Sequence, residues 1–218
     1  MYTPESSLTD PMTAREDTLR YAIRRGAVGA LAAAGRICGP LWRTGRRWVW
    51  SAGVRAQARR VGPRVYAYGP VYFLGTAEVV LGDCGNLYDN VLFETEADGN
   101  ITIGNNFTVN RGSLLSAHTR ITIGDNLLMG EYVSVRDSDH VFRDASMPIR
   151  EQRFESRPIQ IGSDVWIGCG AAILKGVTIG DGAVIGANSV VNREIPAMEV
   201  WAGAPARMIG RRTANGSA

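Results

Sequence analysis

Apolar residues recur at every sixth position over residues 161–196, without a gap. Glycine occupies most of the second positions, and the fifth positions carry small or β-branched residues until Ile195. The first positions of the hexads are Ile161, Ile167, Ile173, Ile179, Ile185 and Val191.

This period of six excludes a continuous helix, whose apolar face recurs about every 3.6 residues. It also fits a plain hairpin poorly, because a hairpin alternates with period two up to its turn. A short strand followed by a sharp corner fits well, with the β-branched residue pointing inward and glycine allowing unusual backbone angles at the corner. Six such hexads predict stacked turns of a parallel β-solenoid.

The same phase continues upstream with interruptions. Coil starts fall at Leu81, Ile103, Ile123, Ile161 and Ile179, with spacings of 22, 20, 38 and 18 residues. Taking 18 residues as the bare coil gives insertions of 4, 2, 20 and 0 residues. An earlier coil is expected within residues 61–80, with its register open. An ordinary β-sandwich with chance periodicity is the alternative, which the uninterrupted hexads disfavour.

The excess of 20 residues falls after Val135 and before Ile161, in the part of the chain that includes the segment DSDHVFRDASMPIREQRFESRP. A long polar loop that leaves a regular scaffold is usually functional. We therefore expect the functional site near this loop.

The net charge differs strongly between two parts of the chain. Residues 14–64 hold twelve arginines and two acidic residues, a net charge of +10, whereas residues 65–218 carry a net charge of −5. The basic segment lacks strand alternation, and three of the chain's five tryptophans follow its Gly39-Pro40 break. We predict a disordered tail at 1–13, a basic helical extension at 14–64, a β-helix domain at 65–211 and a tail at 212–218.

Two compatible roles fit the basic extension. Its apolar side would cover the open end of the β-helix, where unpaired strand edges must be blocked. Basic helices with tryptophan at the interface also favour anionic membrane surfaces. Nucleic acid would match the charge too, but nothing in the solenoid reads bases, so no nucleic-acid partner is expected.

Cysteine usage and hydropathy bear on the compartment. Cys38, Cys84 and Cys169 lie far apart, which argues against a disulfide scaffold and fits a reducing cytoplasm. No run of 18 apolar residues occurs, and residues 1–20 do not form a typical signal peptide. We expect a cytoplasmic protein, located at the inner face of the membrane if the basic extension makes membrane contact.

The hexads resemble those of the hexapeptide-repeat acyltransferases, most closely the branch of galactoside, maltose, nodulation-factor and polysaccharide O-acetyltransferases. The resemblance covers residues from about 75 to 211, and its most specific parts are IGSDVWIGCGAAILKGVTIGDGAVIGANSVVNREIP and VWAGAPARMIGRR. It implies a left-handed parallel β-helix, although the usual crossover is right-handed. It also implies a homotrimer with acetyl-CoA in a cleft between neighbouring subunits.

The resemblance points to His140 as general base. Acyl transfer to a hydroxyl needs a group that removes the hydroxyl proton, and a neutral imidazole suits this near pH 7. His140 lies in DSDH at the mouth of the long insertion, where the family carries its base. Asp137 and Asp139 would orient or stabilise this histidine beside the acceptor, and an exposed acidic loop is the alternative.

Three further residues are expected near the acceptor. Asn110, in FTVNRG, matches a family asparagine that contacts the acceptor, although asparagine is also common at corners. Trp166, in DVWIG, matches a family tryptophan that lines the active-site channel. His118 stands where some relatives carry an acidic residue near the acceptor sugar, so an acceptor role and a structural role both remain open.

The phosphates of CoA favour arginine and backbone N–H donors. Arg207, in GAPARMIG, is the best phosphate candidate, and Arg211 or Arg212 would replace a basic family residue that is Gly210 here. The small side chains of Cys169 and Ala187 would let the pantetheine lie flat along the coils. The cofactor positions implied by the resemblance are Trp166, Cys169, Ala187, Asn192, Arg193, Arg207 and Arg211.

These residues predict direct transfer of an acetyl group from acetyl-CoA to a hydroxyl of a sugar or polysaccharide precursor. An antibiotic or amino-sugar acceptor and a non-catalytic scaffold are the alternatives, and the retained His140, Trp166 and Arg207 disfavour the scaffold.

Cys169 is not expected to be a nucleophile, because nothing nearby completes a triad. No metal is expected, since two histidines cannot supply the three zinc ligands of the related γ-class carbonic anhydrases. If membrane contact holds, a lipid-linked sugar becomes an expected acceptor.

Overall fold

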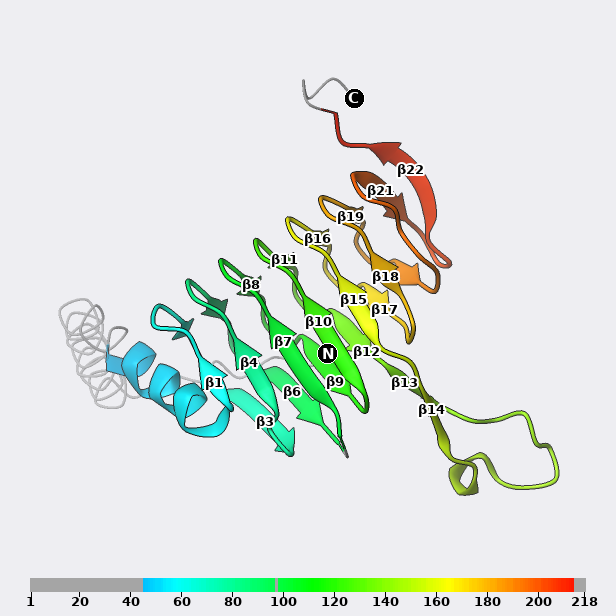
Figure 1. Ribbon diagram of the computed structural model, residues 1–218, viewed down its shortest axis with the longest axis horizontal. Helices are drawn as coiled ribbons and strands as arrows, with labels where there is room; N and C mark the ends of the chain where they lie inside the picture. The colour runs from blue at the N-terminus through cyan, green and yellow to red at the C-terminus, as the bar shows by residue number, and fades with distance from the viewer. Residues whose placement is uncertain (1–44, 97, 214–218) are drawn as a thin grey trace, which may run out of the picture. The chain divides into compact units, whose positions relative to one another are not determined.

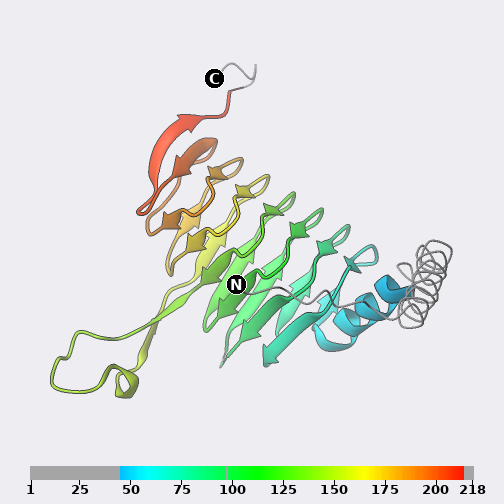
Figure 2. The same ribbon diagram turned by 180° about the vertical axis from the view of Figure 1, so that it is seen from behind.

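The computed structural model describes residues 45–96 and 98–213, and residues 46–213 contain a parallel β-solenoid (Figure 1). A long hairpin projects from one corner of the solenoid (Figure 2). The predicted tail at 1–13, residues 14–44 of the basic extension and residues 214–218 of the C-terminal tail lie outside the described residues.

Three sheets form the faces of the solenoid. Sheet A contains β1 (Arg60–Val61), β4 (Val79–Leu81), β7 (Asn100–Ile103), β10 (Arg120–Ile123), β15 (Ile159–Ile161) and β18 (Thr178–Ile179). Sheet B contains β2 (Tyr66–Ala67), β5 (Asn86–Leu87), β8 (Thr108–Val109), β11 (Leu128–Met129), β16 (Trp166–Ile167), β19 (Val184–Ile185), β21 (Glu199–Ala202) and β22 (Arg207–Arg211). Sheet C contains β3 (Val71–Gly75), β6 (Val91–Thr95), β9 (Leu114–Ala117), β12 (Ser134–Arg136), β17 (Ala172–Ile173) and β20 (Val190–Val191). The hairpin contains β13 (Ser138–His140), the 3₁₀ helix η1 (Ile149–Glu151) and β14 (Phe154–Ser156).

The strand pairing confirms the predicted coils. Leu81, Ile103, Ile123, Ile161 and Ile179 pair in register along sheet A, and all five are buried. The register of the first coil is now defined, because Val61 pairs with Leu81.

The predicted boundaries of the β-helix need correction at both ends. The first strand begins at Arg60, so the boundary predicted between residues 64 and 65 is late by one strand. At the other end, the predicted tail begins at Arg212, yet the guanidinium of this residue forms an ion pair with Asp164 at 2.9 Å. The N–H of Arg212 also donates to the carbonyl of Met198 at 2.7 Å, which fastens this residue to the last coil.

The second-position glycines have a different role from the predicted one. Left-handed backbone angles occur at the fourth hexad positions instead, for example at Asp164 and Gly182. A Cβ at Gly168 would lie 2.6 Å from the backbone nitrogen of Ala187 in the next coil. Glycine at the second position therefore permits neighbouring coils to stack closely, which a side chain would prevent.

The extra residues of successive coils gather at one corner, where the chain passes from sheet C to sheet A. They lie between β6 and β7, between β9 and β10, and between β12 and β15, where the hairpin is inserted. This C–A corner is therefore irregular along several neighbouring coils, whereas the coil strands of sheets A, B and C stay parallel and in register as far as β21, which pairs antiparallel with the last strand, β22.

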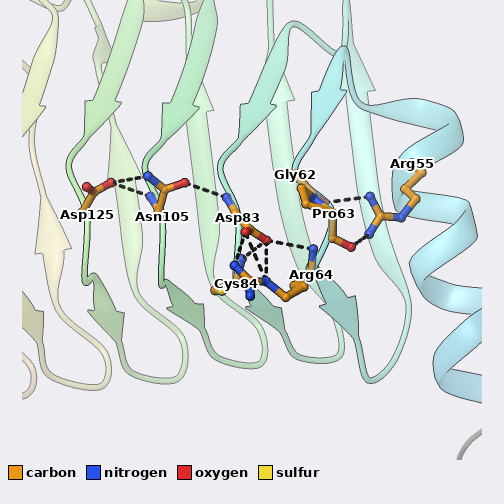
Figure 3. Close-up of polar contacts among 8 residues, drawn as sticks. All are labelled: Arg55, Gly62, Pro63, Arg64, Asp83, Cys84, Asn105 and Asp125. Carbon is orange, nitrogen blue, oxygen red and sulfur yellow. Dashed lines mark hydrogen bonds and ion pairs between the residues drawn. The ribbon is translucent and has the colours of Figure 1, made fainter.

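The corner between sheets A and B carries a ladder of polar side chains (Figure 3). The N–H of Asn105 donates to Asp125 at 2.6 Å, the N–H of Asp83 donates to Asn105 at 2.8 Å, and the N–H of Arg64 donates to Asp83 at 2.9 Å. Each side chain thus satisfies a backbone donor of the preceding coil. The hydrogen-bonded guanidinium of Arg64 holds the pKa of Asp83 well below its usual range.

A helix over residues 45–57 covers the first coil. The hydroxyl of Ser51 accepts a hydrogen bond from the N–H of Ala67 at 2.9 Å. The guanidinium of Arg55 donates to the carbonyls of Gly62 and Pro63 at 2.8 and 2.7 Å (Figure 3). Because these backbone groups belong to the end coil, the helix satisfies polar groups that stacking leaves open and acts as a cap.

Candidate active site

The inserted residues at the C–A corner line a polar groove of about 400 Å³, which we call the histidine groove. Its lining residues are Glu94, Glu96, Ser116, His118, Arg136, Ser138, Asp139, His140 and Phe154. Strands of sheet C and both strands of the hairpin contribute to it, so the insertions and the regular coils together form one site.

His140 lies where the sequence predicted, at the point where the hairpin leaves the solenoid. It is the last residue of β13 and pairs across the hairpin with Phe154 of β14. The two rings lie 4.3 Å apart between centroids, and the imidazole is exposed toward the groove that it lines. An exposed imidazole on a paired strand is accessible to an acceptor and held in place by the fold.

His118 lies in the same groove. Its Nε2 is 3.6 Å from a carboxylate oxygen of Glu96, and its ring centroid is 5.0 Å from that of Phe154. The structure therefore places both histidines against the ring of Phe154 in one groove, and the acceptor role of His118 stays a prediction. The sequence did not identify Glu96 or Phe154, because their approach depends on how the insertions pair in space.

The structure contradicts the predicted role of Asp137. Its side chain is fully buried, and its carboxylate accepts hydrogen bonds from three successive backbone N–H groups at 2.7–2.8 Å. The donors are His118, Thr119 and Arg120. Asp137 therefore stabilises the turn after β9, and its oxygens are directed to the backbone rather than to His140 or an acceptor. Asp139 does line the groove, and its carboxylate accepts a hydrogen bond from Lys175 at 2.7 Å.

A second groove of about 390 Å³ lies along the corner between sheets B and C, and we call it the tryptophan groove. Four of the predicted residues line it: Asn110, Trp166, Cys169 and Ala187. The side chain of Trp166 is 52% exposed, and the amide of Asn110 donates to the carbonyl of Met129 at 3.0 Å. Leu128 and Val184 add apolar surface to this groove.

The predicted acceptor residues thus separate between two corners of one chain. His118, Asp139 and His140 belong to the C–A corner, whereas Asn110 and Trp166 belong to the B–C corner. Sheet C separates the two corners along the chain, so a single chain does not bring these side chains into one groove.

The predicted phosphate ligands differ in their surroundings. Asn192, Arg193 and Arg207 are exposed, and Arg207 opens the last strand, β22. Arg211 instead forms an ion pair with the buried Glu199 at 2.5 Å. A hydrogen bond from the Trp201 indole, together with this guanidinium, lowers the pKa of Glu199. Arg211 therefore has a structural partner within the chain and is a weaker phosphate candidate than Arg207.

Among residues 45–96 and 98–213, no group of three or more histidine, cysteine or acidic side chains is arranged to hold a metal ion. Cys169 is exposed and lines the tryptophan groove.

Known proteins match the chain across the solenoid. The family model for the bacterial transferase hexapeptide (six repeats) matches residues 158–193. The galactoside O-acetyltransferase of Escherichia coli is 41% identical over 115 residues, which are 50% of this chain and 53% of that enzyme. YJL218W of Saccharomyces cerevisiae, named as an acetyltransferase, is 33% identical over 142 residues, which are 63% of this chain and 71% of that protein.

Among solved structures, a galactoside acetyltransferase in complex with coenzyme A superposes with a TM-score of 0.56 at 29% identity, covering 74% of this chain and 68% of that one. The chain spans about half or less of the first curated relatives that it matches. The hexads, the stacked coils and these matches agree with the resemblance noted in the sequence, and the chain belongs to the hexapeptide-repeat acetyltransferase family, with its left-handed parallel β-helix.

Proposed function

We propose that the protein transfers an acetyl group from acetyl-CoA to a hydroxyl of a sugar or polysaccharide precursor, with His140 as general base. The observation that carries this proposal is the position of His140, exposed on a paired strand at the edge of a polar groove. The E. coli relative is named as a galactoside O-acetyltransferase, which supports this reaction and acceptor class.

The reaction needs one base and two aligned substrates. The neutral imidazole of His140 removes the acceptor's hydroxyl proton while the hydroxyl oxygen forms a bond to the thioester carbonyl carbon. A backbone N–H stabilises the negative charge on the carbonyl oxygen. The carbon–sulfur bond then breaks, the imidazolium returns the proton to the CoA thiolate, and the acetylated sugar is released. No acyl-enzyme forms, and alignment of the two substrates supplies much of the acceleration.

We propose a homotrimer as the active form, because the two grooves hold complementary parts of the site on different corners of one chain. A neighbouring copy that presents its tryptophan groove to the histidine groove would bring the thioester to His140. Light scattering on the active protein should give three times the chain mass of 23.5 kDa. A monomer mass with full activity at the same concentration would contradict this assembly.

Arg207 is proposed to bind a phosphate of CoA. Arg207→Ala should raise the KM for acetyl-CoA about 10-fold or more, because a charge-assisted hydrogen bond to an anion contributes roughly 1.5–3 kcal/mol. The KM of the acceptor should change less than twofold. Steady-state kinetics measure both KM values. The same assay on a panel of acyl-CoA donors with sugar, amino-sugar and antibiotic acceptors tests the proposed function. A rise confined to the acceptor KM would show that Arg207 has been wrongly assigned.

The basic extension is proposed to contact anionic membrane surfaces in addition to capping the solenoid. In the capping helix, Trp48 and Val49 are about two-thirds exposed, and Arg46 is exposed as well. No helix in the described part of the chain meets the length and hydropathy needed to cross a bilayer. The intact protein should float with anionic vesicles at low salt, and a chain beginning at Arg46, which keeps the cap, should float less. Equal flotation with neutral and anionic vesicles would argue against this contact.

A further inference from the structure

The chain contains a single lysine, Lys175, and it lies at the base of the hairpin. Lys175 follows β17 at the C–A corner of the coil after the insertion. Its side chain is only 17% exposed, although lysine is rarely buried without a partner. The ammonium donates a hydrogen bond to Asp139 at 2.7 Å and lies 3.6 Å from a carboxylate oxygen of Glu155.

These two carboxylates face each other across the hairpin. Asp139 of β13 pairs directly with Glu155 of β14, and the adjacent pair is His140 with Phe154. Like charges opposite each other in an antiparallel ladder repel and favour separation of the strands. Arg157 also pairs with Glu155, at 2.7 Å, but the ammonium of Lys175 is within 4 Å of both carboxylates. The ammonium of Lys175 therefore offsets the repulsion between these two carboxylates, in the strand pair next to that of His140.

Backbone contacts place Lys175 well for this task. The N–H of Gly176 donates to the carbonyl of Arg157 at 3.0 Å, and the N–H of Arg157 donates to the carbonyl of Asp137 at 2.8 Å. The corner that carries Lys175 is thus hydrogen-bonded to the residue that follows β14. The hydrogen bond from the Arg157 guanidinium and, after it, the charge of Lys175 lower the pKa of Glu155, so this carboxylate stays ionised beside the ammonium.

We propose that Lys175 is a positioning residue, which fastens both strands of the hairpin to the solenoid and thereby holds His140 at the groove. The proposal rests on the proposed role of His140 as general base. A shift of about 1 Å in the position of a general base can lower the reaction rate roughly 10²-fold. The contact of Lys175 with Asp139, one residue before His140, therefore bears directly on the reaction.

Lys175→Met tests the clamp, since methionine keeps an unbranched side chain of nearly the same length and removes the charge. We expect kcat to fall about 10–100-fold, while the KM for acetyl-CoA stays within twofold because the tryptophan groove lies at another corner. Lys175→Arg should restore most of the activity. Lys175→Met/Glu155→Gln should recover part of the loss, because one of the two opposed carboxylates is then neutral.

Hydrogen exchange of residues 138–156 gives a readout independent of turnover. Lys175→Met should increase exchange in β13 and β14 and leave the coils protected. The matched control is Arg64→Met, which also removes an ion pair, with Asp83, but at the A–B corner of the first coil. It should leave kcat and hairpin exchange unchanged.

The outcomes separate the two proposals. Unchanged kcat and unchanged hairpin exchange in Lys175→Met would overturn the positioning role. Loss of activity with increased exchange throughout the solenoid would overturn it as well, because the effect would then be on folding. If wild-type protein transfers acetyl groups and His140→Ala is fully active, the proposed base is wrong and the positioning role falls with it, whatever Lys175→Met does to exchange.

Discussion

Replacing His140 with alanine should lower kcat by about 10²–10⁴-fold, the usual contribution of a general base. The thermal midpoint should change little, because the imidazole is exposed and its described ring contact is with the half-exposed Phe154. The KM for acetyl-CoA should stay near its wild-type value, since the predicted CoA residues lie outside the histidine groove. Steady-state kinetics with acetyl-CoA and the best acceptor measure both constants.

A matched control exists on the same hairpin. Arg153→Ala removes an exposed side chain next to β14 that does not line the histidine groove, so it should leave kcat unchanged. His118→Ala should act differently from both variants and mainly raise the acceptor KM. Full turnover in His140→Ala, with wild-type turnover in the Arg153 variant, would remove the assignment of the base.

The coils could be predicted from the sequence because their cause is local and repeated. Each buried Ile or Val occupies the same place in a coil, so the six-residue period survives in the amino-acid order, and the pairing of Ile103, Ile123 and Ile161 follows it. The role of glycine could not be predicted in the same way. Whether Gly168 is needed for its backbone angle or for the approach of Ala187 depends on the next coil, which the period alone does not position.

The site was predictable only in part, because its residues meet through the inserted segments. The position of His140 at the loop mouth follows from chain order, and the structure confirms it. The contact of Phe154 with both histidines depends on the register of the hairpin, and no local pattern in residues 141–158 determines that register. In DSDH the two acidic residues look equivalent in sequence, yet one is buried in the solenoid and the other lines the groove.

Replacement of the buried acid gives the largest expected loss of stability. Asp137→Ala removes a carboxylate that accepts three backbone hydrogen bonds and leaves their N–H groups without an acceptor inside the protein. Each unsatisfied buried donor costs roughly 1–3 kcal/mol, and partial access of water to the turn reduces the total. We expect a loss of about 3–5 kcal/mol in the free energy of unfolding.

Denaturant unfolding at matched protein concentration measures this loss, because assembly makes apparent stability depend on concentration. Asp181→Ala is the matched control: Asp181 is exposed, and its carboxylate accepts one such hydrogen bond, from the N–H of Ser163 at 2.6 Å. It should cost about 1 kcal/mol or less. If Asp137→Ala were as stable as this control while its acceptor KM rose sharply, Asp137 would belong to the acceptor site after all. The three backbone donors around its buried carboxylate predict the reverse, with unfolding affected far more than acceptor binding.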